Sequence, residues 1–140
     1  MDPKKALMLR WFEEVWNKRR ESAIDEMLAP DAIVHGLSDD PAVPLRGPAG
    51  FKPFYHKFRD AFPDVKITVD QTVIEGDKIV LLCHVRGTHG GGTLGIAARN
   101  KPVSFSGTVI GVIKNGMIVE GWNHFDFLGM FQQLGAVTLN

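Results

Sequence analysis

The spacing of apolar residues changes once along this chain, from a helical period in the first half to an alternating period in the second. The first helical stretch opens at Asp2-Pro3, an N-cap residue followed by proline at the first helical position, and runs to about Lys18. Its apolar side chains lie three or four positions apart and therefore share one helix face. They are Leu7, Met8, Trp11, Phe12, Val15 and Trp16.

Two further helices are expected before the pattern changes. Ser22-Ala23-Ile24-Asp25 resembles a capping box and predicts a short helix that ends near Leu28, before Pro30. Pro48 begins a third helix, and Pro63 ends it because proline cannot continue the helical hydrogen-bond ladder. The apolar face of this helix is an aromatic stripe of Phe51, Phe54, Tyr55, Phe58 and Phe62.

The remaining segments predict strands and their turns. Residues 32–35 form a brief strand, and the polar, proline- and aspartate-rich residues 36–47 form a loop. Glu75-Gly76-Asp77 and Asn115-Gly116 are hairpin turns, the second being the strongest such signal in the chain. The alternating segments between these turns predict strands over residues 66–74, 78–88, 103–113 and 117–126.

This order of elements determines the expected fold class. Helices followed by antiparallel strands are typical of an α+β fold, in which the helices pack on one face of a sheet. A length of 140 residues fits one domain, and 44% hydrophobic residues are enough for a core. We therefore expect a single domain over residues 1–140, without repeats or linkers.

Charge and cysteine content narrow the class of partner. The 16 basic and 16 acidic residues balance, so no global field favours nucleic acid or an anionic membrane surface. Arg10 interrupts the first apolar run, and no segment is long enough for a membrane span. The single cysteine, Cys83, excludes an internal disulfide and is expected to be a small buried side chain. We predict a cytoplasmic protein with no nucleic-acid or membrane partner.

Cofactor and metal motifs are weak in this sequence. The stretch Gly90–Gly95 satisfies the letters of G-x-G-x-x-G but leads into a strand, whereas a phosphate-binding loop opens a helix. No histidine pair has the helical spacing of a zinc site and no CxxC occurs, so a metal would need ligands from distant strands, such as His35 and His84. No serine lies in a G-x-S-x-G elbow. We expect neither a cofactor nor a metal.

The last predicted strand carries the clearest candidate chemistry. Trp122, His124 and Asp126 are two positions apart and so share one strand face. An aromatic ring, an imidazole and a carboxylate would then span about 13 Å, the length of one small-molecule site. Asp126 also precedes an amphipathic stretch that ends at Gly135, and it is equally suited to cap that helix. A capping role does not exclude a catalytic one.

A series of short motifs covers nearly the whole chain. They are Trp16-Asn17, Leu28-Ala29-Pro30-Asp31, Val34-His35-Gly36, Ala61-Phe62-Pro63-Asp64, Arg86-Gly87-Thr88-His89, Phe105-Ser106-Gly107, the run from Asn115-Gly116 through Glu120-x-Trp122 to Asp126, and Gln133-Leu134-Gly135. In this order and spacing they resemble the SnoaL-like polyketide cyclase family of the NTF2-like superfamily.

The resemblance implies both a fold and an activity. The fold is a cone, in which a strongly curved antiparallel sheet wraps around the N-terminal helices and encloses one apolar pocket, commonly in a homodimer. The family's cyclases close a ring by intramolecular aldol condensation without a cofactor. In them a carboxylate near the end of the last strand is the general acid/base, and Asp126 is at the matching position here.

One residue departs from the pattern of the family. Its cyclases place a histidine beside this acid on the penultimate strand, and the corresponding stretch here, Val109-Ile110-Gly111-Val112, has none. His124 or His35 is the candidate to take its place.

Two functions from different classes follow. The first is a cyclase- or isomerase-type enzyme, in which Asp126 removes a proton α to the carbonyl of a hydrophobic compound and His124, His35 or Asn123 hydrogen-bonds the enolate oxygen. The alternative is a protein that binds a small apolar ligand without turnover. A third possibility is an interaction subunit whose functional surface is the convex face of the sheet.

The expected pocket is apolar apart from one polar patch. Its wall should include Trp16, Phe58, Val103, Phe105 and Trp122. The polar patch should combine Asp126 with at least one of His35, His84 and His124.

A homodimer through the sheet is also predicted. In the predicted strand over residues 103–113, every second side chain points away from the apolar face, and these side chains are small or mixed in character. Such a surface can pair with its own copy around a two-fold axis. Its side chains are Ser104, Ser106, Thr108, Ile110 and Val112.

Overall fold

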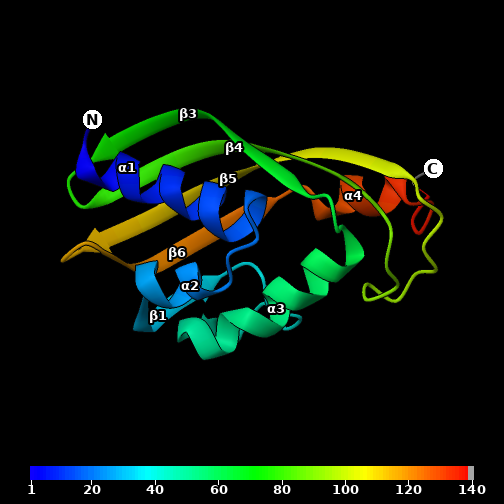
Figure 1. Ribbon diagram of the computed structural model, residues 1–140, viewed down its shortest axis with the longest axis horizontal. Coiled ribbons are helices and arrows are strands. Elements are labelled where there is room, and N and C mark those ends of the chain that lie inside the picture. Colours follow the sequence, from blue (N-terminus) through cyan, green and yellow to red (C-terminus); the bar gives the residue numbers. More distant parts are fainter. Residues whose placement is uncertain (139–140) are drawn as a thin grey trace.

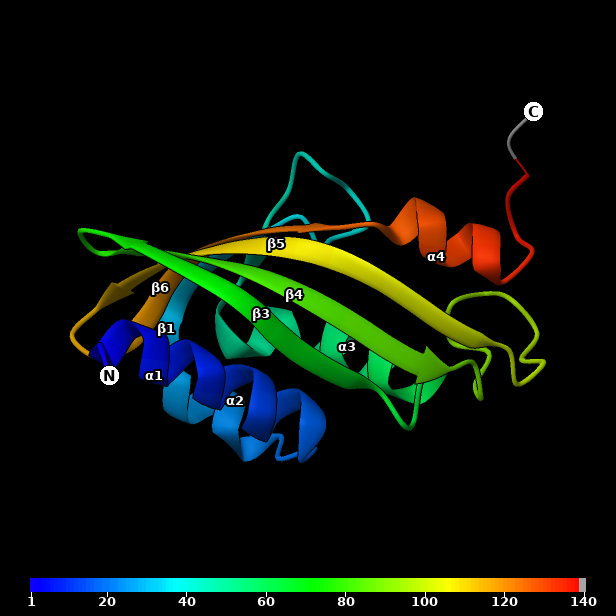
Figure 2. The same cartoon turned by 90° about the horizontal axis from the view of Figure 1, so that it is seen from above.

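The computed structural model describes residues 1–138. Its elements are, in order, α1 (Pro3–Arg10), the π-helical segment η1 (Trp11–Asn17), α2 (Ser22–Met27), β1 (Leu28–His35), β2 (Leu45–Arg46), α3 (Gly47–Ala61), β3 (Lys66–Glu75), β4 (Lys78–Thr88), β5 (Pro102–Lys114), β6 (Met117–Phe125) and α4 (Phe127–Gln133). Figures 1 and 2 show one curved, unclosed sheet with α1, α2 and α3 on the same side. The expected α+β fold is confirmed.

The sheet has the strand order β2-β1-β6-β5-β4-β3. Consecutive strands from β3 to β6 pair antiparallel, as expected from their hairpin turns. The sheet was expected to be antiparallel, and the pair of β1 and β6 departs from this because these two strands are parallel. Parallel pairing requires a crossover connection, and the long segment between these two strands provides one.

Local signals placed most of the strand boundaries within one or two residues. Asn115 and Gly116 have φ values of 52° and 73°, which confirms the predicted hairpin turn between β5 and β6. The first strand is longer than residues 32–35, since β1 begins at Leu28, and the predicted loop contains the short strand β2.

The concave face of the sheet and the helices form the core. On β4 this face consists of Ile79, Leu81, Cys83 and Val85, all buried as the alternation predicts. The aromatic stripe of α3 packs against it, and its members Phe51, Tyr55, Phe58 and Phe62 are buried.

The first predicted helix does not stay α-helical to its end. Over η1 the backbone switches to the wider π-helical turn, and Lys18 donates its N–H to Glu13 O at 2.7 Å, five residues back. This turn brings residues five apart to the same side. Trp11 and Trp16 therefore both reach the ring of Phe51, with centroid distances of 5.3 and 6.3 Å.

A side-chain amide joins η1 to the edge of the sheet. Asn17 accepts from the N–H of Ile67 through Oδ1 at 2.7 Å and donates through Nδ2 to the carbonyl of the same residue at 2.8 Å. The amide thus occupies the place of a neighbouring strand and blocks this part of the β3 edge.

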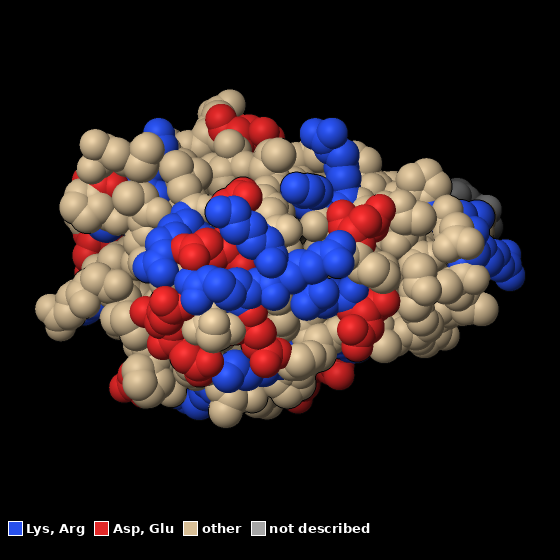
Figure 3. Space-filling view, in the orientation of Figure 1, with Lys and Arg blue, Asp and Glu red and all other residues tan. Residues whose placement is uncertain are grey.

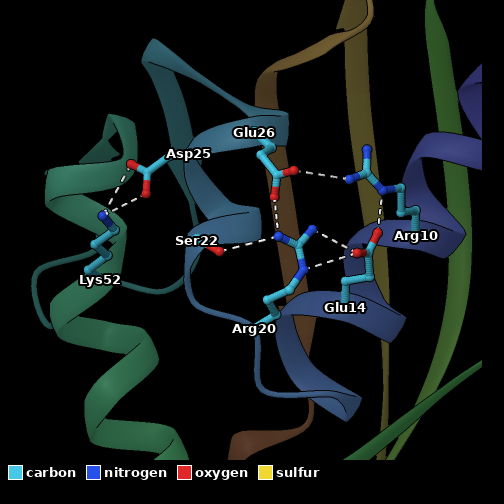
Figure 4. A network of polar contacts seen from close by, with 7 residues as sticks. All are labelled: Arg10, Glu14, Arg20, Ser22, Asp25, Glu26 and Lys52. Atoms are coloured by element: carbon cyan, nitrogen blue, oxygen red, sulfur yellow. Dashed lines mark hydrogen bonds and ion pairs between the residues drawn. The ribbon is translucent and has the colours of Figure 1, made fainter.

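An ion-pair network holds α1, η1 and α2 together (Figure 4). Arg20 pairs with Glu14 at 2.7 Å and with Glu26 at 2.5 Å, and Arg10 pairs with the same two carboxylates. The predicted capping box at Ser22 is wrong, because Ser22 is the first residue of α2 and the N-cap residue, Glu21, forms no side-chain cap hydrogen bond. Across the surface of the helices, lysines and arginines form a band interleaved with acidic side chains (Figure 3).

Candidate functional site

A β-bulge in β6 determines which side chains of this strand face the helices. Ile118 pairs with Ile113 and Glu120 pairs with Val112, so Val119 is left without a partner. An extra residue of this kind inverts the in–out alternation beyond it. Gly121, Asn123 and Phe125 therefore face inward, together with Ile118 on the other side of the bulge.

An apolar cavity lies between the concave face of the sheet and the helices, with a free volume of about 70 Å³. Aromatic rings from η1, α3, β5, β6 and α4 supply much of its wall. The wall consists of Met8, Trp11, Phe12, Trp16, Leu28, Val34, Leu37, Phe51, Phe54, Phe58, Ile67, Val85, Phe105, Val109, Gly111, Ile118, Gly121, Asn123, Phe125 and Phe127. Among these described residues, Asn123 has the only amide side chain, and none has a hydroxyl, imidazole or charged group.

Two of the wall residues that belong to the sheet are glycines. Gly111 and Gly121 are opposite each other in the β5–β6 ladder. A Cβ at Gly121 would meet only the carbonyl oxygen of Ile110, at 3.7 Å, so the space above this residue is open. Neither glycine was expected in the site from the sequence. The available signal was an isolated glycine within a strand pattern, which often marks a bulge or a close approach of a ligand.

Asn123 is held at the end of β6 by a bond to the end of β1. Its Nδ2 donates to His35 O at 3.0 Å. A primary amide has two N–H groups and a carbonyl with two lone pairs, so one N–H and the Oδ1 acceptor have capacity for a ligand. Asn123 is thus a polar group of the wall that can both donate to and accept from a molecule in the cavity.

The expected wall residues are partly those found. Trp16, Phe58 and Phe105 line the cavity, whereas Val103 is buried in the core without lining it. Asn123, expected as a hydrogen-bonding residue, lines the cavity as well. The expectation for Trp122 is wrong, because the bulge turns its side chain to the opposite, convex face.

The histidines lie outside the cavity. His35 packs its ring on Trp122, with centroids 5.1 Å apart, and its Nε2 lies 2.7 Å from Glu120 Oε2. His124 lines the same convex depression as Trp122. His84 bonds Ser104 Oγ at 2.7 Å. No histidine is therefore among the described residues that line the cavity, although one was expected in its polar patch. The bulge in β6 turns His124 to the convex face, and His84 is on the outward face of β4.

Asp126 is exposed at the end of β6 and caps α4. Its Oδ1 accepts from Gly129 N at 2.8 Å, and its own N–H donates to Ser106 O at 3.0 Å. Asp126, His124 and Asn123 line one shallow groove of about 520 Å³ that also includes Phe125. The groove and the cavity are thus lined in common by Asn123 and Phe125. The catalytic roles assigned to Asp126 and His124 stay predictions.

The described residues offer neither a metal site nor a membrane-spanning helix. Within residues 1–138, no three or more histidine, cysteine, aspartate or glutamate side chains are grouped so that they could hold a metal ion. In the same residues, no helix has both the length and the apolar character needed to cross a membrane.

The family model of the SnoaL-like polyketide cyclases matches residues 6–134. The chain therefore belongs to this family. No curated protein matches the chain.

Solved structures of similar proteins share the fold over nearly the full length. TsrD from Streptomyces laurentii is 29% identical, with 96% of each chain covered and a TM-score of 0.82. IdmH from Streptomyces antibioticus, described as a candidate polyketide cyclase, is 28% identical, with 96% of this chain and 99% of that chain covered and a TM-score of 0.82. AclR from Streptomyces galilaeus, described as a candidate hydroxylase, is 25% identical, with 99% of each chain covered and a TM-score of 0.85.

Proposed function

We propose that the protein is a cofactor-independent enzyme of the cyclase or isomerase type that acts on a hydrophobic carbonyl compound bound in the cavity. The observation that carries the proposal is an apolar, largely aromatic cavity whose wall has one amide, Asn123. Small-molecule sites have this composition, in which a few polar groups orient a mostly apolar ligand. Membership of the SnoaL-like family supports the reaction class.

In this proposal the cavity contributes mainly by confinement. Walls that hold a flexible carbonyl compound in a folded conformation bring its reacting carbons together and remove the entropic cost of that approach. The free N–H of Asn123 donates to the carbonyl oxygen and stabilises the negative charge that develops as the enolate forms. Asp126 is the proposed base for the α-carbon because it lines the groove that shares Asn123 and Phe125 with the cavity, and His124 of the same groove is its proposed partner.

The second candidate function is binding without turnover. It is favoured by one observation, that no titratable side chain is among the described residues lining the cavity while the carboxylate of Asp126 is engaged in capping α4.

Two substitutions separate these functions. Asp126→Asn keeps a good N-cap and removes the base. The affinity for hydrophobic ketones, measured by the fluorescence of Trp11 and Trp16 in the cavity wall, should therefore not change. Product formation, followed by mass spectrometry, should fall about a hundredfold or more. Asn123→Leu should weaken binding about tenfold in either case. Wild-type turnover by Asp126→Asn would refute the assignment of the base, and binding without product in the wild type would favour the second candidate.

We also propose that the protein forms a homodimer through the convex face of the sheet. Val73 and Leu82 expose 63% and 38% of their surface there, close to Ile110 and Trp122 in the same face. Apolar side chains gathered on one exposed face are typical of an interaction surface, and a second copy offers a complementary one.

A further inference from the structure

A second chamber adjoins the cavity. This outer chamber has a volume of about 440 Å³ and lies between the segment after β1, the helix α3, the helix α4 and the glycine-rich loop that contributes Leu94. Four residues line both chambers and lie at the boundary between them, called the throat below: Leu37, Phe54, Phe58 and Phe127. The two chambers therefore adjoin, and a ligand that passes between these four side chains would occupy both.

The sizes of the chambers limit how a ligand can occupy them. The inner cavity, at about 70 Å³, is well below the roughly 300–1,000 Å³ of typical small-molecule sites. The outer chamber alone lies within that range. A ligand with several rings or a long chain that places one end in the inner cavity must pass the throat and extend into the outer chamber.

The outer chamber differs from the inner cavity in having charged side chains. Lys57 lines it, one residue before Phe58 of the throat, and its side chain is 43% exposed. The ion partner of Lys57 is Asp39, whose side chain is 97% exposed and whose Oδ1 is 3.5 Å from Nζ. An ion pair so open to solvent contributes little, and its carboxylate loses almost no hydration in it. An anionic ligand can therefore displace Asp39 at low cost.

The backbone around Lys57 is also held in place. Thr93 of the glycine-rich loop donates through Oγ1 to Lys57 O at 2.6 Å, so this loop is tied to the same turn of α3 that forms the throat. The backbone from which the Lys57 side chain projects is thus supported by the loop on the other side of the chamber.

We propose that the site takes an elongated, amphipathic ligand whose apolar body enters the inner cavity and whose anionic end binds Lys57 in the outer chamber. This inference rests on the proposed function, because it assumes that the cavity binds a small molecule. It adds the chemical class of the ligand and a residue that selects for it.

A pair of dyes that differ in one charge tests the inference. N-phenyl-1-naphthylamine is neutral, and 8-anilinonaphthalene-1-sulfonate has the same aromatic body with an added sulfonate. We expect the wild type to bind the sulfonated dye at least five times more tightly, and Lys57→Met to remove that preference while the affinity for the neutral dye is kept. Asp39→Asn should tighten binding of the sulfonated dye about two- to threefold, because the competing carboxylate is gone.

Lys52→Met is the matched control, since Lys52 is on the same helix but pairs with Asp25 outside both chambers. It should leave both affinities unchanged, and added salt should weaken only the preference that depends on Lys57. Equal binding of both dyes by the wild type, or an equal loss with Lys52→Met, would overturn the inference and leave the proposed function standing. Binding of neither dye would overturn both.

Discussion

Single residues shape this cavity largely through small side chains. Gly107 is an example: the ring of Phe125 lies where a Cβ would be, with Cδ1 only 2.2 Å from that position. Any larger residue would push Phe125 out of the cavity wall. Gly121 acts differently, because the space above it is open and a side chain there would project into the cavity. Gly107 thus leaves room for the ring of Phe125 in the wall, and Gly121 leaves space in the cavity for a ligand.

Cys83 gives a prediction at this scale. Its side chain is fully buried, and burial, together with the nearby charge of Asp70, raises the pKa of the thiol to about 12. Because the thiolate is the reactive form, Cys83 should not react with Ellman's reagent in the native protein at pH 8. In guanidinium chloride the same protein should give one thiol per chain. Rapid modification of the native protein would show that this strand opens.

The orientation of a side chain could be predicted from the sequence where local interactions determine it, and not where contacts between distant segments do. The alternation of β4 and the Asn115-Gly116 turn are local patterns, and both were predicted correctly. The inward face of β6 was not, because a bulge at Val119 is a feature of pairing between strands and leaves no distinct local pattern. Trp122 was therefore expected in the cavity and lies on the opposite face.

At the scale of elements, side-chain amides fasten the helices to the sheet. Asn17 binds the backbone of Ile67 at one edge, and Gln133 of α4 binds both backbone groups of Ser104, at 2.8 and 2.9 Å, near the start of β5. Both residues belong to the motifs that resemble the SnoaL-like family, and these hydrogen bonds explain why an amide side chain is needed at each position. The sequence predicted the helices but not these bonds, since each joins residues far apart in the chain.

The ion-pair network between α1, η1 and α2 predicts a pH dependence of stability. Hydrogen bonds from Arg20, and then from Arg10, hold the pKa of Glu14 below its usual value of 4.5. A carboxylate whose pKa is lower in the folded state stabilises the fold above the unfolded value, and this contribution is lost as the pH falls through the folded value. The melting temperature of the wild type should thus fall between pH 5 and pH 3 more steeply than that of Glu14→Gln.

The control for this experiment is Glu75→Gln, which changes the same charge at the far end of β3, outside the network. It should retain the slope of the wild type. Identical slopes for the wild type and Glu14→Gln would mean that the network contributes nothing at acidic pH. A concentrated salt solution should reduce the difference, because these side chains are at the surface.

For the whole molecule, the proposed convex interface predicts an oligomeric state. Sedimentation equilibrium at micromolar concentration should give the mass of two chains for the wild type. Leu82→Asp places a charge within the exposed apolar face and should give the mass of one chain. Val43→Asp, at an exposed valine in the segment before β2, is the matched control and should remain a dimer. A monomeric wild type would contradict the proposal.

The central claim is that the cavity binds a hydrophobic carbonyl compound, and calorimetric titration of Gly121→Leu with 2-acetylnaphthalene tests it most directly. Leucine at this position fills the open space of the cavity, so we expect saturable binding by the wild type and at least tenfold weaker binding by the variant, with an unchanged or higher melting temperature. Val80→Leu adds bulk on the convex face and should bind as the wild type does. Equal binding by Gly121→Leu and the wild type would place the ligand elsewhere and contradict the account.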